Sequence, residues 1–135
     1  MPKPARVEAF KASTPQIVSK SWGHEKIIFN GQYCLKVLVF HARTNSSFHY
    51  HKKKHETFYV QKGEILFGVC NSDDPSSLVE HRLREGESFT VPPGVRHQFY
   101  AITEAEILEG STFHDEADTV RVLPILVIER ALVSS

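Results

Sequence analysis

The feature that most constrains the fold is a series of short segments rich in β-branched and aromatic residues. They occupy residues 26–29, 33–42, 56–61, 64–70, 77–83, 87–91, 96–102 and 105–111. Turn residues separate them, at positions 30–31, 62–63, 71–77, 85–86 and 92–94. Strands at this spacing, without helical crossovers, predict an all-β sandwich or barrel. Helix is expected only at residues 7–13 and, as an alternative to a strand, at 125–133.

Length and charge narrow the functional class. A chain of 135 residues favours a single domain. Sixteen basic residues balance sixteen acidic ones, so we expect neither nucleic acid nor a membrane surface as a partner, but a small molecule. No signal peptide is apparent, and the longest apolar run, at residues 123–128, is too short to span a bilayer. Cys34 and Cys70 stand singly in apolar runs, which predicts buried thiols in a reducing, cytoplasmic compartment.

Three histidines and a glutamate fall within residues 49–56, in the stretch HYHKKKHE. In an extended strand His49 and His51 share one face, and a hairpin brings Glu56 alongside them. His97, after the turn VPPGVR, can add a fourth ligand. Imidazole and carboxylate ligands suit Zn, Mn, Fe, Ni or Co better than Ca or Mg. The stretch therefore predicts a site for one divalent transition metal, against the alternative of a solvated loop with incidental histidines.

Several neighbouring residues have a simpler interpretation. Residues 52–54, three lysines, are expected to form a solvated hairpin tip, with phosphate capture as the alternative. His55 is expected in solvent in the same turn. Strand alternation turns Tyr59 away from Glu56. Trp22 is expected to be a packing anchor.

The two histidine segments together resemble the conserved motifs of the cupins. HYHKKKHETFYVQKG reads as HxH, four residues, Glu, six residues, Gly, and GESFTVPPGVRH as Gly, five residues, Pro-x-Gly, two residues, His. The resemblance implies a single-domain, jelly-roll β-barrel with little helix. It also implies a metal bound by His49, His51, Glu56 and His97. The asparagine usual four residues after the last histidine is Ala101 here.

The flanking segments suggest a narrower resemblance. SWGHEKIIFNGQYCLKVL and LEGSTFHDEADTVRV are similar to the segments that open and close the cupin domain of type II mannose-6-phosphate isomerases and their small stand-alone relatives. Bifunctional members often carry glutamine where His49 stands, and the tail VLPILVIERALVSS departs from the usual acidic-aromatic ending. The resemblance implies a metal-dependent isomerase of a sugar or sugar phosphate.

Such an isomerase must move a proton between adjacent carbons. Glu109 and His24 are the candidate bases, and Arg121 the candidate group for a phosphate or a substrate oxygen; Lys20 and Arg96 are weaker phosphate candidates. Each has a structural alternative. His24, after Trp22-Gly23, can be a structural residue, Glu109 a strand residue satisfied by Arg121, and Arg121 a residue that closes the barrel with a salt bridge. Two other functions remain open, an Fe(II)-dependent cupin dioxygenase and a non-catalytic carbohydrate-binding cupin.

The chain is expected to divide into an N-terminal arm at residues 1–20, a barrel at 21–122 and a C-terminal segment at 123–135. The arm and the apolar C-terminal segment provide material for exchange between subunits. We therefore expect a homodimer.

Overall fold

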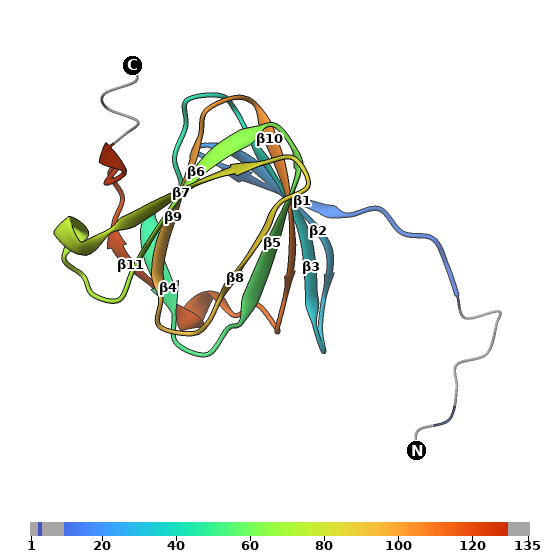
Figure 1. The fold of residues 1–135 in the computed structure, drawn as a ribbon. Coiled ribbons are helices and arrows are strands. Elements are labelled where there is room, and N and C mark those ends of the chain that lie inside the picture. Colours follow the sequence, from blue (N-terminus) through green and yellow to red (C-terminus); the bar gives the residue numbers. More distant parts are fainter. Residues whose placement is uncertain (1–2, 4–9, 130–135) are drawn as a thin grey trace.

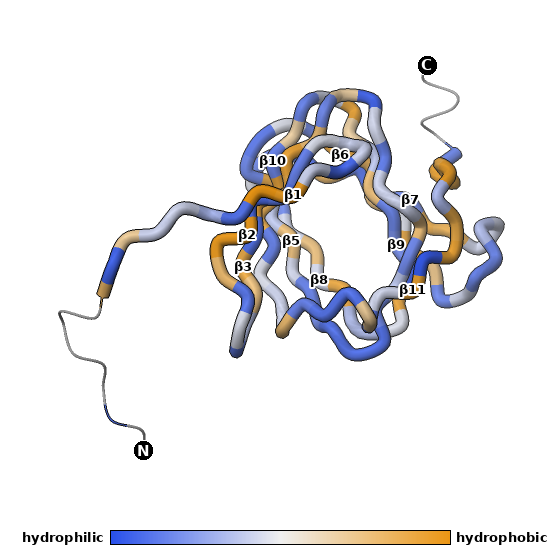
Figure 2. The backbone as a smooth tube through the Cα atoms, turned by 180° about the vertical axis from the view of Figure 1, so that it is seen from behind, coloured by the Kyte–Doolittle hydropathy of each residue, from blue (hydrophilic) through white to orange (hydrophobic). Residues whose placement is uncertain are grey.

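The chain forms a small barrel of two antiparallel sheets in a computed structural model that describes residue 3 and residues 10–129 (Figure 1). In the view from behind, the strands surround a common interior (Figure 2). The predicted all-β jelly-roll fold is confirmed. Within the described part of the chain, no helix is long and apolar enough to cross a membrane.

The first sheet contains, in spatial order, β1 (Gln16–Lys20), β2 (Gly23–Asn30), β3 (Cys34–Phe40), β10 (Ala105–Ser111), β5 (Glu56–Lys62) and β8 (Ser88–Val91). The second contains β11 (Thr119–Leu123), β4 (Phe48–His51), β9 (Arg96–Ala101), β6 (Glu64–Cys70) and β7 (Val79–Arg84). In the described part of the chain, 3₁₀ turns lie at Pro75–Ser77 and Glu116–Asp118. Each predicted strand segment overlaps an observed strand, whereas β1 and β11 were not predicted.

Buried side chains alternate along the strands, and their chemistry changes from one end of the barrel to the other. Polar residues stand two positions from apolar ones in the buried pairs Lys36 and Leu38, Glu56 and Phe58, His97 and Phe99, and Glu109 and Ile107. Strand pairing places residues of the same kind side by side, because polar Lys36 lies opposite Glu109 and apolar Leu38 lies opposite Ile107. One end of the interior is therefore apolar and the other is polar.

Aromatic rings fill the apolar end. Phe67 stacks on Phe99 with ring centroids 4.7 Å apart. Phe58 meets Phe99 edge to face at 4.8 Å. Trp22 is buried and stacks on Phe40 at 4.1 Å, which confirms that it is a packing anchor.

The C-terminal segment packs on the outside of the second sheet. The Gln98 amide donates to Ile125 O at 2.8 Å and accepts from Val127 N at 2.9 Å. Ile128 is completely buried against Leu66. The helix expected at residues 125–133 is not formed at 125–128, and the rest of that range except Glu129 lies outside the described residues. The helix expected at 7–13 is absent from residues 10–13, and 7–9 are not described.

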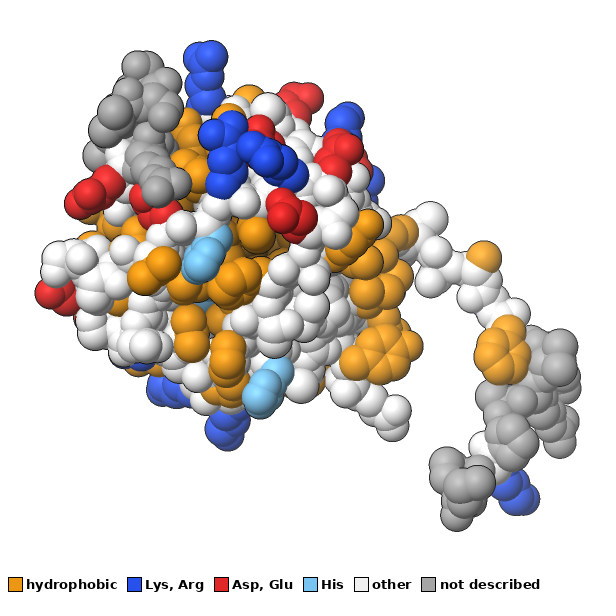
Figure 3. Space-filling view, in the orientation of Figure 1, with side chains coloured by type: hydrophobic (Ala, Val, Ile, Leu, Met, Phe, Trp, Pro, Cys, Tyr) orange, Lys and Arg blue, Asp and Glu red, His pale blue; other side chains and the backbone are white. Residues whose placement is uncertain are grey.

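The N-terminal region divides into two parts. Residues 16–20, which the sequence placed in the arm, form β1 and pair with β2. Residues 10–15 stand away from the barrel, and hydrophobic side chains gather on the surface beside them (Figure 3). The exposed apolar side chains of β1, β2 and the following turn include Ile17, Ile28, Phe29 and Tyr33.

Candidate metal centre

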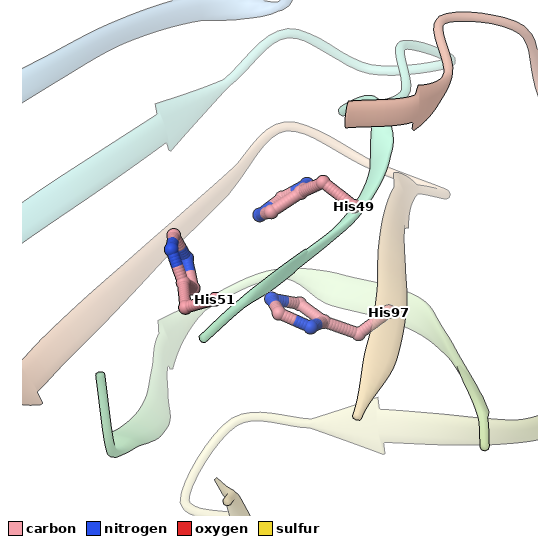
Figure 4. A group of neighbouring side chains, drawn as sticks. All are labelled: His49, His51 and His97. Carbon is pink, nitrogen blue, oxygen red and sulfur yellow. The ribbon is translucent and has the colours of Figure 1, made fainter. Parts of the chain in front are cut away.

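The four predicted metal ligands come together at the polar end of the barrel. His49 and His51 lie on β4, Glu56 begins β5, and His97 lies on β9 directly opposite His49. The candidate ligand atoms of the three histidines all lie within 4.8 Å of one another (Figure 4). Glu56 Oε1 lies 3.3 Å from His51 Nε2 and 3.4 Å from His97 Nε2. Two strands of one sheet therefore bring three imidazoles together, and one strand of the other sheet places a carboxylate against two of them.

Hydrogen bonds on the far side of each ring fix how the imidazoles face this point. His49 Nδ1 donates to Ser47 O and His97 Nδ1 to Val95 O, each at 2.9 Å. His51 Nδ1 lies 3.2 Å from Thr119 Oγ1. A carbonyl can only accept, so His49 and His97 carry their proton on Nδ1 and leave the Nε2 lone pair free. This support of the opposite ring nitrogen is typical of metal-ligating histidines.

Two buried atoms at the centre of this cluster make no hydrogen bond: Glu56 Oε1 and His97 Nε2. Buried polar atoms without a partner cost free energy and are rare in native proteins. A cation between them would satisfy both, and three imidazoles with one carboxylate are donors that divalent transition metals accept. The residues present therefore fit a metal ion of this class.

The ionisation of the site also suits a cation. Burial lowers the pKa of His49 well below its usual range, and burial outweighs the attraction of Glu56 to lower the pKa of His51 to about 4. Burial alone would raise the pKa of Glu56, but His97, His51 and Lys54 outweigh it and lower this pKa to about 2. Near neutral pH His49 and His51 are therefore neutral and Glu56 is ionised, the forms that bind a metal.

A buried lysine connects the metal ligands to a second carboxylate. Lys54 is 3% exposed, and its Nζ lies 2.8 Å from Glu109 Oε2 and 3.5 Å from Glu56 Oε2. It also donates to His114 Nδ1 at 2.9 Å. Burial disfavours the ammonium, but Glu109 and Glu56 outweigh this and raise the pKa of Lys54. Lys54 is therefore a fixed positive charge beside the metal ligands.

The burial of Lys54 corrects the expectation that all three lysines at residues 52–54 form a solvated hairpin tip. Lys52 and Lys53 are exposed, as predicted, but Lys54 is buried because its ammonium has two carboxylates and an imidazole to pair with. His55 is exposed, as predicted. Tyr59 is 42% exposed and faces away from Glu56, also as predicted.

The ligands line a cavity of about 290 Å³ that opens at the polar end of the barrel. Its other walls carry Glu109, Lys54 and Lys36, with Trp22, Phe40 and Phe58 toward the apolar end. Small-molecule pockets range from roughly 300 to 1,000 Å³. The cavity therefore fits a compact ligand of about the size of a monosaccharide.

Comparison with known families decides the relationship that the motifs suggested. The profile of the family described as Cupin matches residues 11–132. The chain belongs to the cupin family. The expected cupin resemblance is thereby confirmed.

This cupin is similar to several characterised proteins over part of their length. Oxalate oxidase GF-3.8 of Triticum aestivum is 30% identical over 78 residues, which cover 57% of this chain and 35% of the relative. The chain thus spans about a third of that relative's length. The structure of the capsular polysaccharide assembling protein CapF from Staphylococcus aureus superposes with a TM-score of 0.73 at 16% identity, over 87% of this chain and 34% of that one. A recombinant oxalate oxidase in complex with glycolate superposes with a TM-score of 0.58 at 26% identity, over 67% and 46% of the two chains.

The three residues predicted for catalysis have different positions in this cupin. Glu109 is buried on the cavity wall, where Lys54 and the Ser111 hydroxyl both reach its Oε2. Arg121 lies at the rim, half exposed, with Nη2 2.6 Å from Glu116 Oε1. The alternative expected for Glu109, that Arg121 satisfies it, is wrong because Lys54 and Ser111 are its partners. The alternative expected for Arg121, a salt bridge, is present, with Glu116 as the partner. His24 does not line the cavity. Neighbouring residues of a strand point to opposite faces, and on β2 it is Glu25 that lies on the cavity face.

The sequence interpretation missed Lys36. Its segment YCLKVLVF was taken as an apolar run, yet Lys36 is 1% exposed and lines the cavity. The available signal was alternation, since Cys34, Lys36, Leu38 and Phe40 share the buried face of β3. A lysine in such a row is a candidate for an internal charge.

Proposed function

We propose that this cupin is a metal-dependent aldose–ketose isomerase that acts on a small sugar or sugar phosphate. The observation that carries the proposal is Glu109, a buried carboxylate on the wall of the same cavity as the four metal ligands. The resemblance of the flanking segments to type II mannose-6-phosphate isomerases supports it.

His49, His51, Glu56 and His97 would hold the metal. When bound, the ion supplies Lewis acidity that polarises neighbouring hydroxyl and carbonyl oxygens of the sugar. Glu109 takes the proton from one carbon and returns it to the next. Lys54 and Ser111 fix Glu109 by its Oε2 and leave Oε1 outside both of these contacts. Arg121 contacts a substrate oxygen at the rim, and no role is assigned to His24.

The test is solvent exchange and turnover with metal-loaded protein. Mannose 6-phosphate, fructose 6-phosphate and free pentoses are each incubated in D₂O with protein loaded separately with Mn, Fe, Co, Ni or Zn, and followed by proton NMR. We expect interconversion with deuterium at C2 of an aldose product or at C1 of a ketose product, and a turnover rate that is roughly 10²- to 10⁴-fold lower in Glu109→Gln. Glu106→Gln, on the outward face of the same strand, is the control. Neither exchange nor turnover with any sugar at full metal occupancy would contradict the proposal.

A second candidate is an oxygen-dependent enzyme, because the identity to oxalate oxidases reaches 30% in sequence and 26% among solved structures. Oxygen uptake by iron- or manganese-loaded protein with small dicarboxylates or diols distinguishes it from the isomerase. Sugar binding with neither isomerisation nor oxygen uptake would leave the carbohydrate-binding alternative.

We further propose that the chain forms a homodimer. The exposed apolar side chains over β1 and β2 and the projecting residues 10–15 support this. Light scattering at micromolar concentration tests it, and a monomer mass would contradict it.

A further inference from the structure

Lys36 is a buried cation with few partners. It is 1% exposed on β3 and lines the cavity. Within the described part of the chain its one ion pair is with Glu25, whose Oε2 lies 3.5 Å from Lys36 Nζ. An ammonium has three donors, and a buried charge is costly unless it is paired and hydrogen-bonded.

The other buried lysine of the cavity provides the comparison. Lys54 reaches Glu109 at 2.8 Å and His114 at 2.9 Å, with Glu56 as a further partner at 3.5 Å. The charge of Lys54 is thus balanced inside the protein. Among the residues that the structure describes, the charge of Lys36 is balanced by one carboxylate alone, at 3.5 Å.

The charge of the whole cavity favours an anion. Four basic side chains line it (Lys20, Lys36, Lys54 and Arg121), together with four glutamates. The protein contribution is therefore neutral while the histidines are neutral. A divalent ion at the metal centre leaves a positive excess, which attracts a negatively charged ligand.

We propose that Lys36 binds an anionic group of the substrate, a phosphate or a carboxylate, while the metal centre binds its hydroxyl or carbonyl oxygens. The inference rests on the proposed function in taking this cavity as the substrate site. Arg121 is less suited to the role, because it is half exposed and already paired with Glu116. Lys36 instead lies inside, directly across the strand pair from Glu109. Its ammonium lies where an anion would be shielded from water, which strengthens a charge-assisted hydrogen bond.

Calorimetry with ligands that cannot isomerise tests this inference apart from catalysis. Mannitol 1-phosphate, gluconate and mannitol are six-carbon compounds that differ in their anionic group, and each is titrated into metal-loaded protein. We expect the phosphate or the carboxylate to bind at least tenfold more tightly than mannitol, and the tighter of the two identifies the group. Calorimetry measures binding and not turnover. The absence of isomerase activity would therefore contradict the proposed function without contradicting this inference.

Three variants assign the effect. Lys36→Met should raise the Kd of the preferred anion roughly 10- to 100-fold and leave that of mannitol unchanged. Glu25→Gln should tighten anion binding, because it releases Lys36 from its partner; this variant keeps the lysine and serves if Lys36→Met does not fold. Lys26→Met, on β2 and outside the cavity lining, is the control. Equal affinity for all three ligands, or equal losses for anion and mannitol in Lys36→Met, would overturn the inference, as would unchanged anion affinity in Glu25→Gln.

Discussion

Lys54 Nζ lies 2.8 Å from Glu109 Oε2, in a part of the barrel where both side chains are about 3% exposed. The same ammonium lies 3.5 Å from Oε2 of Glu56, a candidate metal ligand. The positive charge of one lysine therefore compensates the negative charges of both the candidate base and the candidate metal ligand. Removing it leaves two buried carboxylates without a shared counterion.

Lys54→Met should destabilise the fold by about 3 to 5 kcal/mol, because breaking a buried pair leaves uncompensated charge. Urea denaturation monitored by fluorescence measures the change. Lys53→Met, at the exposed neighbouring position, should change stability by less than about 0.5 kcal/mol. Equal stabilities of the two variants would show that Lys54 does not carry this role.

Thr119→Val should weaken metal binding roughly 10- to 100-fold without removing a ligand, because Thr119 Oγ1 supports His51 Nδ1 at 3.2 Å. Competition with a chelating dye measures the affinity. Thr57→Val is the control, since its hydroxyl pairs with Thr90 on the exposed surface. An unchanged metal affinity in Thr119→Val would mean that this contact does not orient the ring.

Gly23→Ala should be far more damaging than Gly86→Ala. Both glycines have positive φ, +147° and +88°, but a Cβ at Gly23 would lie 1.9 Å from Val39 O, whereas nothing lies within 4 Å of one at Gly86. We expect a cost of about 1 to 2 kcal/mol at Gly86 from backbone strain, and at least about 2 kcal/mol more at Gly23. Thermal unfolding of the two variants makes the comparison, and similar costs would contradict it.

The metal-free protein should lose stability between about pH 6.5 and pH 4. The pKa of His51 is lowered to about 4 in the fold from an ordinary 6.5, so over this interval the unfolded chain binds a proton that the folded chain does not. The free energy of unfolding should fall by about 1 to 3 kcal/mol as the pH drops through this range, with no further loss from His51 below it. Urea denaturation of chelator-treated protein tests this, and His51→Gln should show a shallower dependence. The same pH dependence of stability in the natural protein and in His51→Gln would show that a group other than His51 causes the loss.

Local sequence patterns were sufficient for most of the strands and for the clustering of the candidate metal ligands. Turn residues bracket the strands, and His49, His51, Glu56 and His97 occupy fixed places in two short motifs, so their positions follow from local spacing. β1 and β11 carry weaker local signals, and their pairing with β2 and β4 became evident only in the assembled sheets.

The charges of the cavity were harder to predict for a physical reason. A lysine in a run of three is usually solvated, and the burial of Lys54 depends on Glu109 and His114, which are distant in the sequence. The burial of Lys36 could have been predicted from the alternation of β3 alone. It was missed because the other three residues on that face are apolar and the segment was taken as an apolar run. Predicting a pairing between charges on separate strands requires the folded structure, whereas predicting the face of a strand that a residue occupies requires only the sequence.

The number of transition-metal ions bound tightly by each chain tests the central claim most directly. Chelator-stripped protein is reloaded, desalted and measured by inductively coupled plasma mass spectrometry, alongside His97→Ala and, as a control, exposed His55→Ala. We predict about one ion per chain in the natural protein and in His55→Ala, and almost none in His97→Ala. No bound ion in the natural protein, or full occupancy in His97→Ala, would contradict the account.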